Sequence, residues 1–228
     1  EVTFTSILKG CGDFRDIKEG KQIHNMIVIR GWLEENVELG NALVDMYAKC
    51  GALAEAYEVL LKELHDRDLI TWSSLIARYV EQGQTLEALK CFEQMQEQGI
   101  SPNAITFVSA LKACCNIGAI DIGQEIHAMV ERKGLLEKNL FLGSTLVDMY
   151  AKLGCFMEAQ GVFVRLRSRN VVSWNAIIGA YIQHEFCEEG FSCFKQMCHE
   201  GVCPIGSTFI YSLKACGGME DIKKVSEV

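Results

Sequence analysis

The 228-residue sequence has very little proline and no long apolar run, and each scarcity argues against a class of protein. It contains two prolines against 49% hydrophobic residues, so a disordered chain is not expected. No stretch of about 18 uncharged apolar residues occurs, so no membrane-spanning helix is expected. The first residues lack the basic segment and apolar stretch of a signal peptide. Because an initiating methionine is also missing, we expect the sequence to be part of a longer protein.

The sequence also lacks an excess of positive charge. Its 22 lysines and arginines stand against 30 aspartates and glutamates, which gives a formal net charge of −8. Nonspecific nucleic-acid binders usually have a basic footprint, so this balance argues against that class, although a local basic stripe is still compatible with it. The 11 cysteines are an odd number without an export signal, which argues against a disulfide framework. Their spacing fits no common metal site, so we expect buried thiols and no cofactor.

What the sequence does contain is internal repetition. The segment LVDMYAK occurs at 43–49 and again at 146–152, and the residues around both copies are also similar. Three kinds of segment alternate with a combined period of about 103 residues, and the segments carry apolar residues at helical spacing. We therefore divide the chain into repeats at 1–36, 37–68, 69–103, 104–139, 140–170 and 171–205, with a partial repeat at 206–228.

Each repeat is expected to form two helices, because two positions vary little between repeats. The eighth position always holds a branched aliphatic residue, and the twentieth always holds glycine or alanine, which allows close helix approach. A lone helical hairpin cannot bury both of its faces, so neighbouring hairpins must stack. The sequence predicts an all-α fold, a right-handed α-solenoid of stacked helix-turn-helix repeats. The eighth-position residues are Leu8, Val44, Ile76, Leu111, Val147, Ile178 and Leu213. The twentieth-position residues are Gly20, Ala56, Ala88, Gly123, Ala159 and Gly190.

The stretches LVDMYAKCG, TFVSALKACCNIGAIDIGQEIH and VVSWNAIIGAYIQ resemble the short (S), long (L) and standard (P) motifs of plant pentatricopeptide repeat (PPR) proteins, PLS subclass. On this resemblance 1–36 and 104–139 are L-type, 37–68 and 140–170 are S-type, 69–103 and 171–205 are P-type, and 206–228 is a partial L-type repeat. The resemblance implies sequence-specific binding of single-stranded RNA, about one base per repeat. It also implies a protein of the mitochondrion or chloroplast that guides RNA modification, with C-to-U editing favoured.

In that family the fifth and last residues of a repeat read the base, and the second residue wedges against base faces. Transferred here, the base-reading residues are Thr5 with Asn36, Asn41 with Asp68, Ser73 with Asn103, Ser144 with Asn170, and Asn175. The wedge residues are Val2, Ile70, Phe141 and Val172. If the chain runs parallel to the RNA, the expected target is 5′-(A)-U-A-N-A-Y-3′. L-type repeats read bases poorly in this family, so Thr5 should contribute little.

Several positions depart from the family pattern. Val108 and Ile210 stand at fifth positions and cannot hydrogen-bond a base edge, and Ile205 replaces the usual polar last residue. Glu38 stands where an aliphatic wedge is expected, and a carboxylate beside a base is costly to desolvate. We therefore expect weak discrimination in the fourth and sixth repeats and weaker binding by the second.

Other recurring residues have two interpretations each. Lys49 and Lys152 share the thirteenth position and are candidates for phosphate contacts, with a solvated helix flank as the alternative. Trp72 and Trp174 recur at the fourth position, where packing between helices is favoured over base stacking. His24 and His127 recur without an evident nucleophile or carboxylate partner, which favours packing over catalysis.

Two functions from different classes follow. The leading hypothesis is an RNA-binding guide that does not perform the chemistry and works with protein editing factors. The alternative is a protein-interaction scaffold whose groove holds a partner, which the acidic charge favours. The zinc-deaminase signature H-x-E with P-C-x-x-C does not occur, so an enzyme is not expected. No membrane or DNA partner is expected either.

Overall fold

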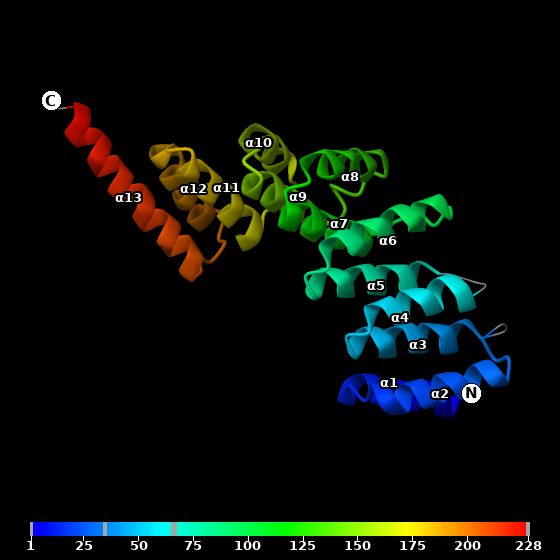
Figure 1. Cartoon of the computed structure of the whole chain (residues 1–228). Coiled ribbons are helices and arrows are strands. Elements are labelled where there is room, and N and C mark those ends of the chain that lie inside the picture. The colour runs from blue at the N-terminus through cyan, green and yellow to red at the C-terminus, as the bar shows by residue number, and fades with distance from the viewer. Residues whose placement is uncertain (1, 34–35, 65–67, 227–228) are drawn as a thin grey trace. The chain divides into compact units, whose positions relative to one another are not determined.

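The computed structural model describes residues 2–33, 36–64 and 68–226, with only the backbone described for Val2 and for 218–226. Every regular element in these ranges is helical (Figure 1). None of the described helices is long and apolar enough to cross a membrane. The elements are α1 (Val2–Phe14), α2 (Ile17–Ile29), α3 (Val37–Lys49), α4 (Leu53–Glu58) with the π-helical turn η1 (Val59–Glu63), α5 (Leu69–Glu81), α6 (Thr85–Glu97), α7 (Ala104–Ile117), α8 (Ile120–Arg132), α9 (Leu140–Lys152), α10 (Phe156–Arg165), α11 (Val171–Gln183), α12 (Cys187–His199) and α13 (Gly206–Ser226).

The helices form two compact units, Glu1–Ala113 and Cys114–Val228. In the first unit α1 packs along α3 and α3 along α5, as Figure 1 shows from blue to green. The helices α2, α4 and α6 each pack against the preceding first helix of their pair. In the second unit α9, α11 and α13 follow the same order, and α10 and α12 pack on α9 and α11. Each unit is therefore a stack of helical hairpins, as the sequence predicts.

The helix starts follow the division made from the sequence. The first helix of each pair begins at the first residue of its expected repeat or one residue later, at Val2, Val37, Leu69, Ala104, Leu140, Val171 and Gly206. The repeat boundaries and the assignment of L, S and P types stay predictions.

The eighth-position residues form the core with one exception. Six of the seven are fully buried, as expected for the inner face of a first helix. Leu213 on α13 is 71% exposed, so the expectation of burial is wrong at this position. Within the described part of the chain, α13 continues to Ser226 and no second helix of its repeat folds back over Leu213.

The twentieth-position residues allow the close approach that their size predicts. A Cβ atom at Gly20 on α2 would lie 2.4 Å from Sδ of Met46 on α3. In the second unit, a Cβ atom at Gly123 on α8 would lie 2.6 Å from Sδ of Met149 on α9. Both methionines are buried, so a thioether from the next repeat fills the space that a side chain at each glycine would occupy.

Candidate nucleic-acid interface

The last residue of each complete repeat, except the sixth, caps the first helix of the next repeat. In each case a side-chain oxygen accepts a hydrogen bond from the backbone N–H three residues later, which satisfies one free donor at the helix start. The distances between oxygen and nitrogen run from 2.8 to 3.0 Å. The capping residues are Asn36, Asp68, Asn103, Asn139 and Asn170.

The second repeat joins its fifth residue to its cap. The amide Nδ2 of Asn41 donates a 3.0 Å hydrogen bond to Oδ2 of Asp68, and Thr71 donates to Oδ1 of Asn41. Thr71 also donates to Oδ1 of Asp68 at 2.6 Å. Burial acts to raise the pKa of Asp68, but hydrogen bonds from Thr71 and Asn41 outweigh it and keep that pKa below its usual value. The carboxylate therefore stays charged and fixes the orientation of the amide.

In the third repeat, one intermediate side chain connects the fifth residue to the capping residue. The hydroxyl of Ser73 lies 2.7 Å from that of Thr106, which in turn donates to Oδ1 of Asn103 at 3.0 Å. Ser73 is buried, so its hydroxyl faces protein groups rather than solvent. A base could reach it only if the side chain rotated away from Thr106.

The second unit contains the two remaining fifth-position residues. Ser144, 1% exposed, donates to the backbone oxygen of Leu140 at 2.7 Å and to Oδ1 of Asn170 at 3.0 Å. Asn175 is more open, and its amide donates to the hydroxyl of Ser207 at 3.1 Å. Ile205 has no polar side chain, and Thr208 donates to Oδ1 of Asn175 at 2.7 Å, as Thr71 does to Asn41.

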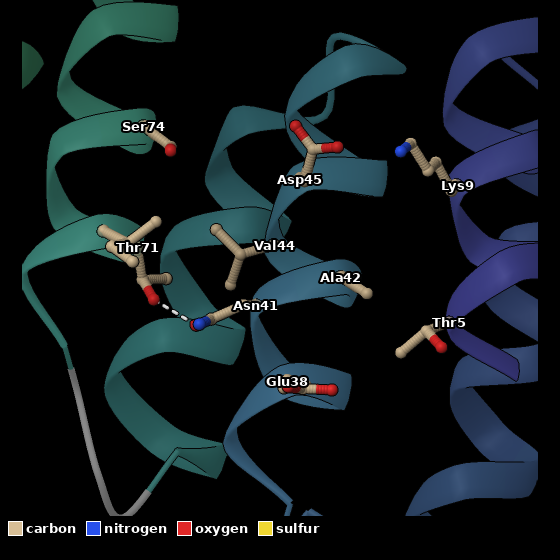
Figure 2. A pocket seen from close by; sticks show the side chains of 10 residues that line it. Thr5, Lys9, Glu38, Asn41, Ala42, Val44, Asp45, Thr71 and Ser74 are labelled. Atoms are coloured by element: carbon tan, nitrogen blue, oxygen red, sulfur yellow. Dashed lines mark hydrogen bonds between the residues drawn. The ribbon is translucent and has the colours of Figure 1, made fainter. Parts of the chain in front are cut away.

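The first unit has a cavity beside Thr5 and Asn41. It measures about 340 Å³ and is lined from α1, α3 and α5 (Figure 2). Thr5 and Lys9 project from α1, and Figure 2 shows them across from α3, which carries Glu38 and Asn41. The cavity thus brings together Thr5 and Asn41, two of the predicted base-reading residues. Its other lining residues are Ala42, Val44, Asp45, Ile70, Thr71 and Ser74.

The predicted wedge residues lie at the surface wherever their side chains are described. Ile70, Phe141 and Val172 are exposed, whereas the side chain of Val2 lies outside the described residues. Sequence analysis missed Ile105, which is 65% exposed at the second position of the fourth repeat. Its position in the repeat was the signal that could have found it. Exposed apolar side chains at a fixed position are suited to contact base faces.

The two candidate phosphate-binding lysines differ in their surroundings. Nζ of Lys49 pairs with Asp13 at 2.8 Å and with Asp45 at 3.0 Å, and the hydrogen bonds that it donates to these carboxylates raise its pKa. Lys152 is exposed, and its ion pair joins it to Asp148 at 2.8 Å. Lys152 is therefore better placed than Lys49 to contact a phosphate.

His24 has a carboxylate partner, contrary to the expectation from sequence, because its Nε2 lies 2.6 Å from Glu63. Nε2 of His127 lies 3.4 Å from Glu131 and makes no hydrogen bond to the described residues. Each Nδ1 contacts a tyrosine hydroxyl of the following repeat, Tyr47 at 2.9 Å and Tyr150 at 3.0 Å. Glu63 was missed because it is distant in sequence, whereas Glu131 lies one turn beyond His127 and could have been found. The contacts join neighbouring helices, so the preference for packing stands.

The tryptophans and cysteines fit their packing interpretation. Trp72 and Trp174 are fully buried, which rules out base stacking in this conformation. All 11 cysteines are free. Burial raises the pKa of Cys91 and of Cys114 to about 12, so both thiols stay protonated. Among the described residues, no group of histidine, cysteine or acidic side chains is arranged to hold a metal ion.

Comparison with known proteins gives consistent matches. The model of the PPR repeat family matches residues 67–116, and that of the PPR repeat matches residues 2–32, 41–62, 144–171 and 172–202. A chloroplastic pentatricopeptide repeat-containing protein of Arabidopsis thaliana is 38% identical over 224 residues, which cover 97% of this chain and 36% of that protein. A mitochondrial one from the same plant is 38% identical over 222 residues, which cover 97% of this chain and 21% of that protein. The chain thus spans about a third or less of these two relatives.

Solved structures support the fold. The crystal structure of the pentatricopeptide repeat protein PPR10 in complex with an 18-nt psaJ RNA element matches with a TM-score of 0.73 at 21% identity, covering 95% of this chain and 32% of that one. The crystal structure of PPR10 from maize matches with a TM-score of 0.61 at 18% identity, covering 99% of this chain and 38% of that one. These matches confirm the all-α solenoid predicted from the sequence.

Proposed function

This chain belongs to the pentatricopeptide repeat family, and we propose that it binds single-stranded RNA of an organelle and guides C-to-U editing without performing the chemistry. Its relatives are named as chloroplastic or mitochondrial proteins, in agreement with the expected location. The PPR10 structure of the same fold holds an RNA element. Selection of the transcript is assigned to this chain, and deamination to separate protein editing factors.

One observation carries the proposal: fifth-position side chains are linked to the capping residue of their own repeat. Asn41 and Ser144 bond their caps directly, and Ser73 does so through Thr106. A polar group that is oriented before its ligand arrives loses less entropy on binding. The short amide of Asn41, held in this way, is suited to the Watson–Crick edge of a splayed base, whereas the buried hydroxyls of Ser73 and Ser144 must first rotate toward it.

The expected target is 5′-(A)-U-A-N-A-Y-3′, with base choice carried by Asn41, Asp68, Ser73, Asn103, Ser144, Asn170 and Asn175. Fluorescence anisotropy with a labelled RNA that holds this sequence, against a permuted RNA of equal composition, tests the proposal. The expected outcome is tighter binding of the target. Equal binding of both RNAs would contradict sequence-specific reading.

Two substitutions test the assignment of individual repeats. Ser73→Asn should move preference at the third target base from A toward a pyrimidine, by roughly tenfold. Because Ser73 is buried, the more open Asn175 provides a second test, and Asn175→Ser should move the sixth base from a pyrimidine toward A. Ser192→Asn, at an exposed position on α12, is the matched control and should change neither preference. Unchanged preferences in the first two variants would refute the assignment.

A protein-interaction scaffold is the second candidate. The net charge of −8 and the exposed Met157 and Val164 on α10 favour it, since such side chains can pack against a partner. Binding to an editing factor that persists at high salt and is not displaced by RNA would favour this function. RNA binding, by contrast, weakens as salt rises, because binding of the protein releases counterions from the phosphates and added salt opposes that release.

A further inference from the structure

We propose that the second unit binds an arginine-bearing segment of a partner protein at four clustered rings, here called the aromatic edge. The rings belong to Phe156, Tyr181, His184 and Phe186. They lie where the starts of α10 and α12 meet the end of α11 (Figure 1). The inference goes beyond RNA binding, because none of the predicted base-reading residues belongs to this edge.

The geometry of the rings is the first observation. The ring centroid of Phe156 lies 4.8 Å from that of Tyr181, 5.4 Å from that of His184 and 5.8 Å from that of Phe186. The amide Nε2 of Gln160 donates a 3.0 Å hydrogen bond to the Tyr181 hydroxyl and so fixes that ring. His184 and Phe186 are nevertheless exposed, Phe186 to 45%. The aromatic edge is therefore held together by ring contacts and accessible to a ligand.

The charge around the rings is the second observation. Four exposed carboxylates stand one to three residues from a ring of the aromatic edge in the chain, and they are Glu158, Glu185, Glu188 and Glu189. Burial first, and then the charges of Cys193 and Glu189, raise the pKa of Tyr181, which places Glu189 near that ring. Among the described residues, no cation pairs with these carboxylates or lies over the four rings. An RNA phosphate would be repelled here, whereas a cationic side chain would be attracted.

The same unit already contains an arginine that is bound by this combination of groups. The guanidinium carbon of Arg169 lies 4.8 Å from the ring centroid of Phe163 and 5.6 Å from that of Trp174. Its Nη1 donates to Glu200 at 3.0 Å. A planar, weakly hydrated guanidinium can stack on a ring while it pairs with a carboxylate, which an ammonium does less well. The aromatic edge offers rings and carboxylates without a guanidinium, so arginine is the residue that fits it.

The equivalent edge of the first unit has a different chemistry. Its residues at the four ring positions are Leu53, Tyr79, Gln82 and Gln84. The amide of Gln82 donates to the backbone oxygen of Ala48 at 3.2 Å, and the hydroxyl of Tyr79 donates to that of Leu53 at 3.0 Å. These side chains are used within the fold and form no cluster of rings. Arginine binding is therefore expected at the second unit and not at the equivalent edge of the first.

Glu185 adds an observation about the backbone. Its φ is +66°, and Gly83 at the equivalent position of the first unit has a φ of +74°. Glycine adopts this left-handed conformation without strain, whereas glutamate does not. The second unit thus keeps a carboxylate beside the rings although it strains the backbone. Because Glu185→Gly relieves the strain, this variant can separate a loss of binding from a loss of folding.

The aromatic edge and the predicted base-reading residue of the sixth repeat lie at different ends of α11. Asn175 is near the start of this helix, and His184 follows its last residue. At 1.5 Å per residue the two positions are roughly 13 Å apart along the helix axis. A segment at the aromatic edge therefore leaves room for a base at Asn175.

The test measures the fluorescence anisotropy of three labelled peptides of equal length with the whole chain. The peptides share the same apolar residues and carry arginine, lysine or glutamate at the same positions. The arginine peptide should bind tightest, and the lysine peptide roughly 3- to 10-fold more weakly. The glutamate peptide should not bind, because its charge is that of the edge.

Two variants locate the binding site. Phe186→Gln, which introduces the side chain of the first unit, should weaken binding of the arginine peptide roughly 5- to 30-fold. Glu185→Gly should weaken it roughly 2- to 5-fold, while thermal unfolding shows no loss of stability. Phe14→Gln and Glu93→Gln, at exposed positions on α1 and α6, are the matched controls and should leave binding unchanged. Phe186→Gln should also leave the affinity for the labelled target RNA unchanged.

Each outcome supports or overturns the inference. If no peptide binds, or the arginine and lysine peptides bind equally, the proposed recognition of arginine is refuted. If all four variants bind the arginine peptide as the wild type does, the net negative charge explains the binding and the aromatic edge is refuted as its site. If Phe186→Gln weakens RNA binding instead, the edge belongs to the RNA path. Peptide binding without RNA binding would refute the proposed function and leave this inference intact.

Discussion

Asp68 holds the amide of Asn41 at 3.0 Å while its other carboxylate oxygen caps α5 through the backbone N–H of Thr71 at 2.8 Å. One side chain therefore starts α5 and orients a predicted base-reading group on α3. The same double role belongs to Asn170, which caps α11 and accepts from Ser144. These residues serve both folding and the predicted recognition of RNA. The two roles can be separated only by a substitution that removes one and keeps the other.

Substitution of Asp68 tests this sharing. Asp68→Ala should lower the free energy of unfolding by about 0.5–2 kcal/mol, because the cap of α5 is lost. Asp68→Asn should leave stability nearly unchanged, since asparagine caps as well as aspartate. Urea denaturation measures both. An equal loss in the two variants would show that the charge, rather than the cap, carries the stability.

Close helix approach at the twentieth position gives a second prediction. Gly20→Leu should lower the free energy of unfolding by about 1–3 kcal/mol, because the new side chain overlaps Met46. Gly161→Leu on α10 is the matched control, since nothing lies within 4 Å of a Cβ atom there. It should raise stability by up to about 1 kcal/mol through helix propensity. Thermal or urea unfolding that ranks Gly20→Leu above the control would contradict the packing.

Acid sensitivity of the second unit should depend on His127. Burial lowers the pKa of His127 below its ordinary value of 6.5, with the Arg165 charge acting in the same direction against Glu131. The unfolded chain therefore binds a proton at this histidine more readily than the folded chain does. Neutral His127 thus contributes stability that is complete above pH 6.5 and is lost as the pH falls below that value. His127→Gln should lose less stability than the wild type between about pH 7.5 and 5.5 in urea denaturation. Identical losses would refute this contribution.

The two thirteenth-position lysines should respond differently to substitution. Lys152→Gln should weaken RNA binding and reduce the slope of log affinity against log salt by about 0.7, as expected for one lost contact to a single strand. Lys49→Gln should change that slope less, because the ammonium of Lys49 already forms ion pairs with Asp13 and Asp45. Anisotropy across a salt series measures both. Equal slopes would show that RNA displaces the two carboxylates.

The sequence was sufficient for the fold because its signals repeat. The eighth and twentieth positions recur in nearly every repeat, and each marks a contact within one hairpin or with the next. The prediction failed at Leu213, where burial depends on a neighbour rather than on the residue itself. The burial of Ser73 and Ser144 was also beyond the sequence. Whether a hydroxyl faces solvent is decided by partners distant in sequence, such as Thr106 for Ser73 and Asn170 for Ser144.

The candidate site was predictable in position but less so in chemistry. Position within the repeat located Asn41 and Thr5 at one cavity, yet Glu38 was read only as an unfavourable wedge. Glu38 is exposed and lines the same cavity. The histidines show the same limit, because Glu63 lies 39 residues from His24 and no local pattern connects them.

The capping role of the last residue limits how such an array can change. A position that must begin a helix accepts chiefly asparagine, aspartate, serine, threonine or glycine. A mutation that retargets the protein there is restricted to that small set of residues if the cap is to be kept, and Ile205 is the one last residue of a complete repeat outside that set. New specificities should therefore arise more freely at positions that do not cap a helix. The requirement for a helix cap limits which base-reading residues the last position can hold.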